Sequence, residues 1–247
     1  MSDAATLRRK LLMAAAPTLK RWMFRGGFAP GPFTRWAYAG ANDLLLISRE
    51  GYEWLWRSFV ATPMFLARCA EHGDDISIDR VPYVVGQCRL VLGSRIRVSG
   101  KLGILGCMRS VPTLTIGDGC FIGHDCAFGV ARSVTIGNHV SIGTGTYISD
   151  TMGHSHRKLG VPIWEDQAEE SDIQPVIIDD DVHIGRDCII LRGVRIGARS
   201  VIGAGSVVRH SVPADSIVAG NPGRVAGWRE ERVTPVPPSP SQSLVES

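Results

Sequence analysis

A six-residue repeat dominates the carboxy-terminal half of this 247-residue chain. An aliphatic residue occupies every sixth position from 178 to 208, and glycine directly follows three of these residues. The repeating residues are Ile178, Ile184, Ile190, Ile196, Ile202 and Val208. An α-helix would repeat its inward face at three, four and seven residues, and a plain strand alternates at two. The spacing therefore predicts a parallel β-helix of hexapeptide repeats, in which the aliphatic side chain points inward and the glycine permits a tight corner.

The same repeat runs upstream, with one interruption at Ser110 and a shift of two residues at Val130. Its first register comprises Leu92, Val98, Ile104, Ile116, Ile122 and Phe128, and its second continues at Ile136, Ile142 and Ile148. A β-sandwich with frequent turns is the alternative, but sandwich strands are longer and turn at irregular intervals. Stacked coils bury each other's aliphatic side chains, and each such side chain contributes about 1.5–3 kcal/mol. The stacked aliphatic side chains can therefore drive folding by themselves.

The pattern divides the chain into three parts. Residues 1–75 are expected to form a helical segment, and residues 76–228 the β-helix domain. Within that domain, residues 151–175 leave the hexapeptide pattern and form a long excursion loop, which is usually a functional feature. Residues 229–247 are rich in proline and serine and are expected to be a disordered tail.

The amino-terminal part has two expected helices. Residues 2–24 combine basic residues with a short apolar run, which favours an amphipathic helix over a signal peptide. It could pack on the body or on a neighbouring subunit, or make a peripheral contact with a membrane surface. Residues 34–71 are expected to be helical, with an interruption or restart at Pro63. Tryptophans in this segment suggest a cap over the open end of the β-helix or a subunit contact, and these are Trp36, Trp54 and Trp56.

Composition narrows the class of function. The net charge of +3 is too small to indicate nucleic-acid binding. The six cysteines are scattered singles without a CxxC pair, so no disulfide framework is expected and a cytoplasmic location fits. Cys120, Cys126 and Cys188 fall on the repeat and are interpreted as small apolar fillers.

Several short motifs between residues 62 and 228 resemble those of a known family. They are Ile148-Ser-Asp-Thr-Met-Gly-His154, Val182-His-Ile-Gly-Arg186, Gly193-Val-Arg-Ile-Gly197, Ile202-Gly-Ala-Gly-Ser-Val-Val208 and Ala219-Gly-Asn-Pro-Gly-Arg224. Together they resemble the hexapeptide-repeat acyltransferases, and within these the sugar and polysaccharide O-acetyltransferases. The resemblance implies a left-handed β-helix, acetyl coenzyme A as acyl donor, no metal, and a homotrimer whose sites lie between neighbouring subunits.

The resemblance also assigns catalytic roles. His154 corresponds to the family's catalytic Gly-His and is expected to act as general base, a role that typically contributes about 10²–10⁴-fold. His156 is the rival, and simple solvent exposure is the alternative for both histidines. Asp125 is the candidate that orients the base, at a position where the family often has Asn. A solvated carboxylate at a corner of the coil is the other interpretation of Asp125.

Acetyl coenzyme A is expected to lie in a groove along the β-helix. Its thioester end would be lined by Gly185 and Arg186. Its pantetheine would pass close to the backbone at Ala204 and Gly205, which small residues permit. Its phosphates and adenine would be contacted by Arg209 and Arg224. Each arginine could instead be an ordinary surface residue.

Three alternatives remain. The scaffold also serves serine acetyltransferases and antibiotic acetyltransferases, and it can be a non-catalytic assembly subunit. A γ-type carbonic anhydrase would need three converging imidazoles, for which the candidates are His124, His139 and His183. Acidic residues of the excursion loop either bind a sugar or form a solvated face, and they are Glu165, Asp166, Glu169 and Glu170.

The sequence and the resemblance together predict a cytoplasmic acetyl-coenzyme A-dependent O-acetyltransferase that acts on a sugar or a cell-surface polysaccharide precursor.

Overall fold

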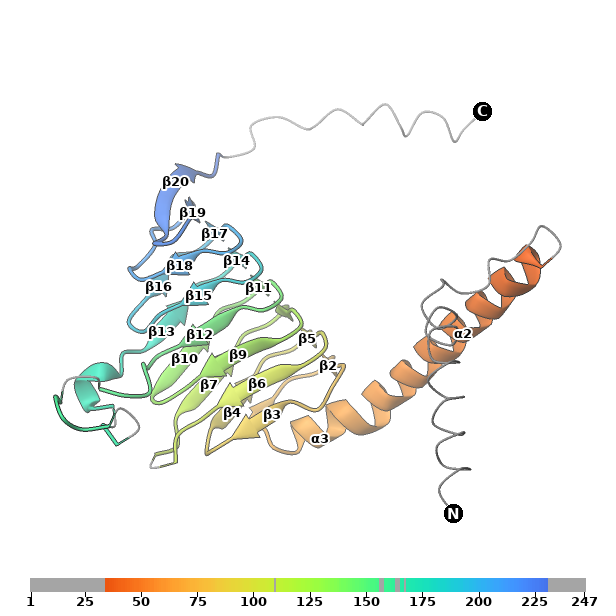
Figure 1. Ribbon diagram of the computed structural model, residues 1–247, viewed down its shortest axis with the longest axis horizontal. Helices are drawn as coiled ribbons and strands as arrows, with labels where there is room; N and C mark the ends of the chain where they lie inside the picture. Colours follow the sequence, from red (N-terminus) through yellow and green to blue (C-terminus); the bar gives the residue numbers. More distant parts are fainter. Residues whose placement is uncertain (1–33, 109, 156–157, 163–164, 167, 231–247) are drawn as a thin grey trace, which may run out of the picture. The chain divides into compact units, whose positions relative to one another are not determined.

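A computed structural model describes residues 34–108, 110–155, 158–162, 165–166 and 168–230. Residues 71–228 contain the predicted parallel β-helix, whose coils stack three sheets around one core and which begins five residues earlier than expected (Figure 1). Sheet A is formed by β1 (Glu71–His72), β4 (Arg89–Leu92), β7 (Thr113–Ile116), β10 (Ser133–Ile136), β13 (Val176–Ile178) and β16 (Arg195–Ile196). Sheet B is formed by β2 (Ser77–Ile78), β5 (Arg97–Val98), β8 (Phe121–Ile122), β11 (Ser141–Ile142), β14 (His183–Ile184), β17 (Val201–Ile202), β19 (Ser216–Ala219) and β20 (Arg224–Trp228). Sheet C is formed by β3 (Tyr83–Val85), β6 (Leu102–Leu105), β9 (Cys126–Gly129), β12 (Tyr147–Ser149), β15 (Ile189–Ile190) and β18 (Val207–Val208).

The predicted aliphatic residues form the core, with each face of the β-helix contributing one column. Ile178 and Ile196 stack in sheet A, Ile184 and Ile202 in sheet B, and Ile190 and Val208 in sheet C. All six side chains are buried. The hexapeptide prediction is therefore confirmed, because consecutive repeats place their aliphatic residue on consecutive faces.

Departures from the six-residue period all fall at one kind of corner. We call the segments that lead from a strand of sheet C to the next strand of sheet A the C–A corners. Ile104 of β6 and Ile116 of β7 are twelve residues apart, so residues 106–112 are an insertion as long as one repeat. Reading Ser110 as a lapse within a coil was therefore wrong, since it lies in this insertion. The shift of two residues at Val130 is a longer corner at 130–132, and the large excursion follows one coil later at 150–175.

Both ends of the β-helix are covered. At the first coil, the π-helical turn η1 (Arg57–Ala61) and the helix α3 (Thr62–Leu66) pack on β2. Ala61 and Phe65 are buried there, and the backbone N–H of Ile78 donates a hydrogen bond to Thr62 Oγ1 at 3.0 Å. At the last coil, β20 pairs antiparallel with β19 and ends the parallel ladder. Pro63 lies in the first turn of α3, so the expected restart of the helix is confirmed.

The helix α2 (Arg35–Trp56) precedes this cap, and the chain divides into two compact units at residues 52 and 53. None of its residues is buried, and the side chains of Trp36 and Trp54 are 76% and 54% exposed. Trp56 is half-buried, and the side chains buried in the cap are those of Ala61 and Phe65. No helix among the described residues is long and apolar enough to cross a membrane. The amphipathic helix expected at 2–24 and the tail from residue 231 lie outside the described residues.

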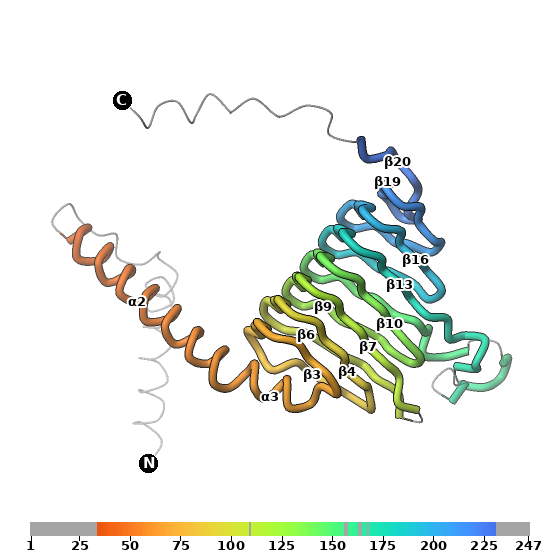
Figure 2. The backbone as a smooth tube through the Cα atoms, turned by 180° about the vertical axis from the view of Figure 1, so that it is seen from behind, coloured from red at the N-terminus to blue at the C-terminus, as the bar shows by residue number. Residues whose placement is uncertain are grey.

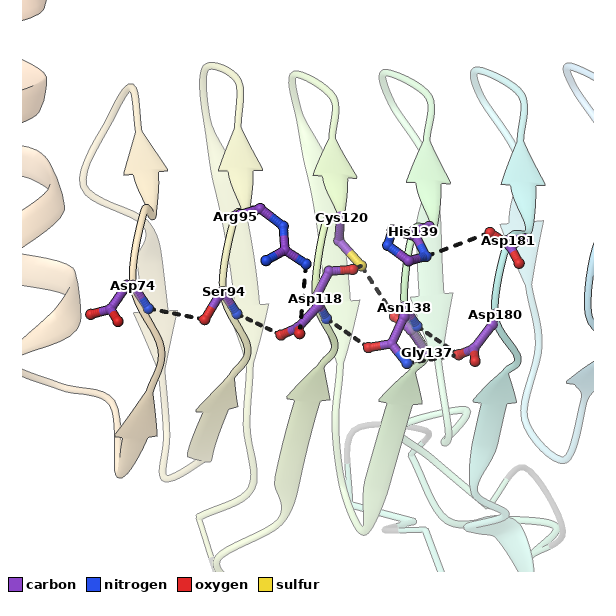
Figure 3. A network of polar contacts seen from close by, with 10 residues as sticks. All are labelled: Asp74, Ser94, Arg95, Asp118, Cys120, Gly137, Asn138, His139, Asp180 and Asp181. Atoms are coloured by element: carbon purple, nitrogen blue, oxygen red, sulfur yellow. Dashed lines mark hydrogen bonds and ion pairs between the residues drawn. The ribbon is translucent and has the colours of Figure 1, made fainter.

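A ladder of side-chain acceptors joins successive coils at the corners between sheets A and B (Figure 3). The backbone N–H of Ser94 donates to Asp118 Oδ1 at 2.7 Å, and that of Asp118 donates to Asn138 Oδ1 at 2.9 Å. The backbone N–H of Asn138 in turn donates to Asp180 Oδ1 at 2.7 Å. Each corner therefore has its amide satisfied by a side chain of the next coil, which fixes the stacking where the strands are interrupted.

We expect Asn138→Ala to lower the free energy of unfolding by about 1 kcal/mol, because the Asp118 amide loses its acceptor. Asn138→Asp keeps an oxygen for that amide but places a second carboxylate beside Asp180, so its cost should shrink as salt is added. Urea unfolding at two salt concentrations measures both variants. An Asn138→Ala protein as stable as the parent would show that the ladder contributes nothing.

Candidate functional site

A cleft of about 690 Å³ opens at the C–A corners, where three consecutive coils carry extra residues. Its walls come from the insertion at 106–112, the corner at 130–132 and the excursion loop, together with Leu105 at the end of β6. Figures 1 and 2 show the insertion at 106–112 and the excursion loop leaving the β-helix from the same edge. The insertions that interrupt the sequence pattern are therefore the parts that build the cleft.

His154 lines this cleft. The residue is half-buried, and its Nδ1 atom is shielded from solvent. Thr151 and Gly153 lie beside it in the wall, and Gly153 has a φ of 80°, a left-handed conformation that glycine adopts without strain. The residue predicted as general base therefore lines a cleft, whereas His156 lies outside the described residues. Full solvent exposure, the alternative for His154, is not what the structure shows.

Asp150 holds the start of the excursion loop against the neighbouring corner. It is fully buried, and its carboxylate accepts hydrogen bonds from the backbone N–H groups of Ala131, Arg132 and Ser133, each at 2.7 Å. Its carbonyl oxygen accepts from the N–H of Gln174 at 2.9 Å, which ties the two ends of the loop together. Burial raises the pKa of the Asp150 carboxyl, and the three N–H donors act against that rise. The cleft wall and the loop are thus joined at one side chain.

Of the four acidic loop residues considered for sugar binding, three are exposed, as expected for a solvated face, and one is buried. Asp166 is 2% exposed, and its carbonyl oxygen accepts from the N–H of Ser155, the residue after His154, at 2.9 Å. Lys158 Nζ lies 3.8 Å from Asp166 Oδ1 and 3.6 Å from Glu169 Oε1. The interpretation of Asp166 as part of a solvated face is therefore wrong, because its carboxylate is buried against Lys158.

One ion pair lies in the cleft wall. Arg132, on the corner that Asp150 holds, pairs with Glu170 of the excursion loop, and both residues line the cleft. Glu170 begins a short 3₁₀ turn (Glu170–Asp172) that a reciprocal capping box of Glu169 and Asp172 stabilises. The pair therefore connects the corner of one coil with the loop of the next.

Asp125 lies at a different corner of the same chain. It follows β8 at the turn between sheets B and C, is exposed and has a φ of 53°. Asp187, two coils further along, occupies the same corner with a φ of 55°. Asp and Asn tolerate this left-handed conformation better than most residues, which gives Asp125 a conformational reason for its position. Within one chain, the structure does not bring Asp125 and His154 together.

Four of the predicted cofactor residues form a column at this same B–C corner. The N–H of Gly205 donates to Arg186 O at 2.8 Å, and that of Gly185 donates to Ile202 O at 2.8 Å. A Cβ atom on Gly185 would lie 2.6 Å from the backbone nitrogen of Ala204, so only glycine fits there. Arg186 and Ala204 are exposed on the outer side of the column. A strand of sheet C, which has two to four residues or roughly 7–13 Å of extended chain, separates this column from the C–A corners.

Arg209 and Arg224 lie near the last coil. Arg209 directly follows β18, and Arg224 begins β20, and both are exposed. Arg224 lines a small cavity of about 260 Å³ together with His210 and Gly223. The backbone N–H of Gly223 donates to Val207 O at 2.8 Å, which holds the Arg224 segment against β18.

The histidines considered for zinc do not converge within the chain. His124 lies at a B–C corner, His139 at an A–B corner and His183 on β14. Among the described residues, no group of three potential ligands is placed to hold a metal ion.

Five of the six thiols are not activated as nucleophiles. Burial raises the pKa of the Cys69 and Cys88 thiols to about 11, and it also raises the pKa of Cys120, Cys126 and Cys188. The last three are buried in the core, as expected for apolar fillers.

Family models match both stretches of repeats. "Bacterial transferase hexapeptide (six repeats)" matches residues 175–210, and "Hexapeptide repeat of succinyl-transferase" matches residues 113–150. The repeats are of the hexapeptide transferase type. A 2,3,4,5-tetrahydropyridine-2,6-dicarboxylate N-acetyltransferase of Staphylococcus aureus is 35% identical over 91 residues, which cover 37% of this chain and 31% of that relative. The chain thus spans about a third of the length of this relative.

Solved structures share the architecture. A variant of the N-acyltransferase AntD from Bacillus cereus, in complex with dTDP-4-amino-4,6-dideoxyglucose and coenzyme A, superposes with a TM-score of 0.55 at 19% identity. The match covers 70% of this chain and 90% of that one. A hexapeptide-repeat acetyltransferase of Vibrio cholerae, complexed with acetyl coenzyme A, is 26% identical with a TM-score of 0.46, covering 78% of this chain and 92% of the other. The likeness to AntD supports the shared hexapeptide β-helix.

Sequence reasoning missed the cleft walls other than the excursion loop. Nothing in the pattern marks Leu105 or the burial of Asp150, whereas the two-residue shift at Val130 marks the corner that holds Arg132. The interruption at Ser110 was the available signal, because a failed inward position can indicate a loop that leaves the coil.

Replacing Asp150 should separate its structural contribution from simple loss of charge. We expect Asp150→Ala to lower the free energy of unfolding by about 3 kcal/mol, since three backbone N–H groups lose their acceptor at about 1 kcal/mol each. Asp150→Asn keeps one acceptor oxygen and should cost less. Denaturant unfolding measures both, and equal stability of all three proteins would contradict the role given to this carboxylate.

Proposed function

We propose that this protein is an acetyl-coenzyme A-dependent acyltransferase that moves an acetyl group to a hydroxyl of a sugar or cell-surface polysaccharide precursor. The observation that carries the proposal is the position of His154, which lines a ligand-sized cleft on a hexapeptide-repeat scaffold. The clefts that bind small molecules typically have about 300–1,000 Å³, and this one lies within that range.

His154 would act as general base. As the acceptor oxygen attacks the thioester carbonyl, its proton passes to the imidazole, and a C–O bond forms. The tetrahedral intermediate then collapses, the C–S bond breaks, and the thiolate of coenzyme A takes the proton from the imidazolium. The half-buried environment of His154 supports this role, because a base that is held in a wall approaches the acceptor in one orientation.

A reaction that used both the predicted cofactor column and His154 would need residues from two corners. In one chain the Gly185–Gly205 column and His154 lie on opposite edges of sheet C. The expected homotrimer would resolve this separation by placing the B–C corner of one subunit beside the C–A corner of the next. Asp125, at the B–C corner, would then orient His154 of the neighbouring subunit.

An amine acceptor is the second candidate. It is favoured by the curated relative, which is named as an N-acetyltransferase. An imidazole base serves both chemistries, so the product decides between them. An ester is cleaved by neutral hydroxylamine and an amide is not, which distinguishes O-acetyl from N-acetyl products by mass spectrometry.

We expect His154→Ala to lower kcat by about 10²–10⁴-fold while leaving the thermal unfolding temperature unchanged, because it removes the base without removing a core contact. His72→Ala, which removes an exposed imidazole on β1, is the matched control and should keep parental activity. Thiol release from acetyl coenzyme A with a panel of sugar and amine acceptors measures both. Equal turnover by His154→Ala and the parent would remove the mechanism.

We expect Asp125→Ala to lower kcat about tenfold or more, since it would leave the base without its orienting partner. Asp75→Ala is the control for backbone strain, because Asp75 has a similar φ of 56° at another corner. The pH profile of kcat should change only in the Asp125 variant. If both aspartate variants retain parental kcat, Asp125 is a corner residue and nothing more.

A further inference from the structure

The cleft beside His154 has one strongly apolar wall. Leu105, Met108 and Val111 are 42%, 78% and 61% exposed, and all three line the cleft. Leu105 ends β6, and the other two belong to the insertion at 106–112. Water-exposed apolar side chains gathered beside a catalytic candidate need a reason, because leaving them in water costs free energy that burial against a ligand would recover.

A second, polar part of the cleft wall is electrically balanced. Arg132 and Glu170 are its charged residues among those described, and they pair with each other. Ser110 and Thr151 add hydroxyl groups to the lining. This wall can hydrogen-bond a neutral polar group without demanding a charge of either sign.

We propose that this cleft takes an amphipathic acceptor, with its reacting hydroxyl or amine beside His154 and an alkyl or similar apolar group on the wall of Leu105, Met108 and Val111. The inference rests on the proposed acyltransferase function and names the class of its acceptor. The polar part of the acceptor would contact the Arg132–Glu170 pair.

A small molecule suits this cleft better than a protein segment does. The volume of about 690 Å³ lies in the range typical of small-molecule sites. An apolar group carried by the acceptor covers the apolar wall and brings the reacting group with it.

Two glycosides that differ only in their alkyl chain test the proposal. The probes are methyl and hexyl β-D-glucopyranoside, and isothermal titration calorimetry on the full-length protein measures their dissociation constants. We expect the hexyl compound to bind at least tenfold more tightly, because its additional methylene groups leave water on the apolar wall. Equal affinities, or undetectable binding of both compounds, would overturn the proposal.

Substitutions in the apolar wall test whether it causes the preference for the hexyl glycoside. Met108→Ser combined with Val111→Ser should reduce the hexyl-over-methyl ratio to threefold or less and leave methyl glucoside binding unchanged. Both side chains are exposed, so their loss leaves the core intact. Val81→Ser, at an exposed valine on the first coil, is the matched control and should keep the full ratio. A ratio that survives in the double variant would place the apolar contact elsewhere and overturn the assignment.

Because this readout is binding, it separates the two proposals. His154→Ala should retain the preference for the hexyl glycoside while losing acetyl transfer. An alkyl preference that depends on Met108 and Val111, in a protein that never consumes acetyl coenzyme A, would uphold the cleft as an amphipathic site and refute the acyltransferase function. Acetyl transfer without any alkyl preference would do the opposite.

Discussion

Each coil of this protein must place an aliphatic side chain directly over that of the previous coil. The columns through Ile178 and Ile196, Ile184 and Ile202, and Ile190 and Val208 meet this requirement with fully buried side chains. A residue added within a strand would turn every following side chain to the other face. Extra chain is therefore tolerated only at corners, where it can leave the coil and return without disturbing the columns.

The cleft follows from that constraint. All three additions in the middle of the β-helix, at 106–112, 130–132 and 150–175, fall at C–A corners of consecutive coils, so they lie side by side. Their contacts are specific: Asp150 binds the corner at 130–132, and Arg132 of that corner pairs with Glu170 of the long loop. The candidate site is thus assembled from loops, and the buried carboxylate of Asp150 anchors these loops to the β-helix.

The sequence predicted the parts of the molecule that repeat. Periodicity assigns the inward residues, because a coil of three short strands returns an aliphatic residue at every sixth position. It also marked the excursion that carries His154. It signalled the insertion at 106–112 only through the failed inward position at Ser110, because the insertion adds six residues and keeps the following residues on the period. It could not show that Asp150 and Asp166 are buried, because an acidic residue in a loop has the same sequence signature whether it is solvated or bonded to backbone amides. The position of α2 on the sequence was expected, but its exposed tryptophans were not.

The insertion at 106–112 also has a consequence for how such scaffolds diversify. It adds the length of a whole repeat without adding a coil, so Ile104 and Ile116 still occupy neighbouring faces and the columns continue in register. Chain can therefore be gained, lost or replaced at this edge while the folding information in the columns stays the same. Natural variation and protein engineering can both reshape the mouth of the cleft without first redesigning the core.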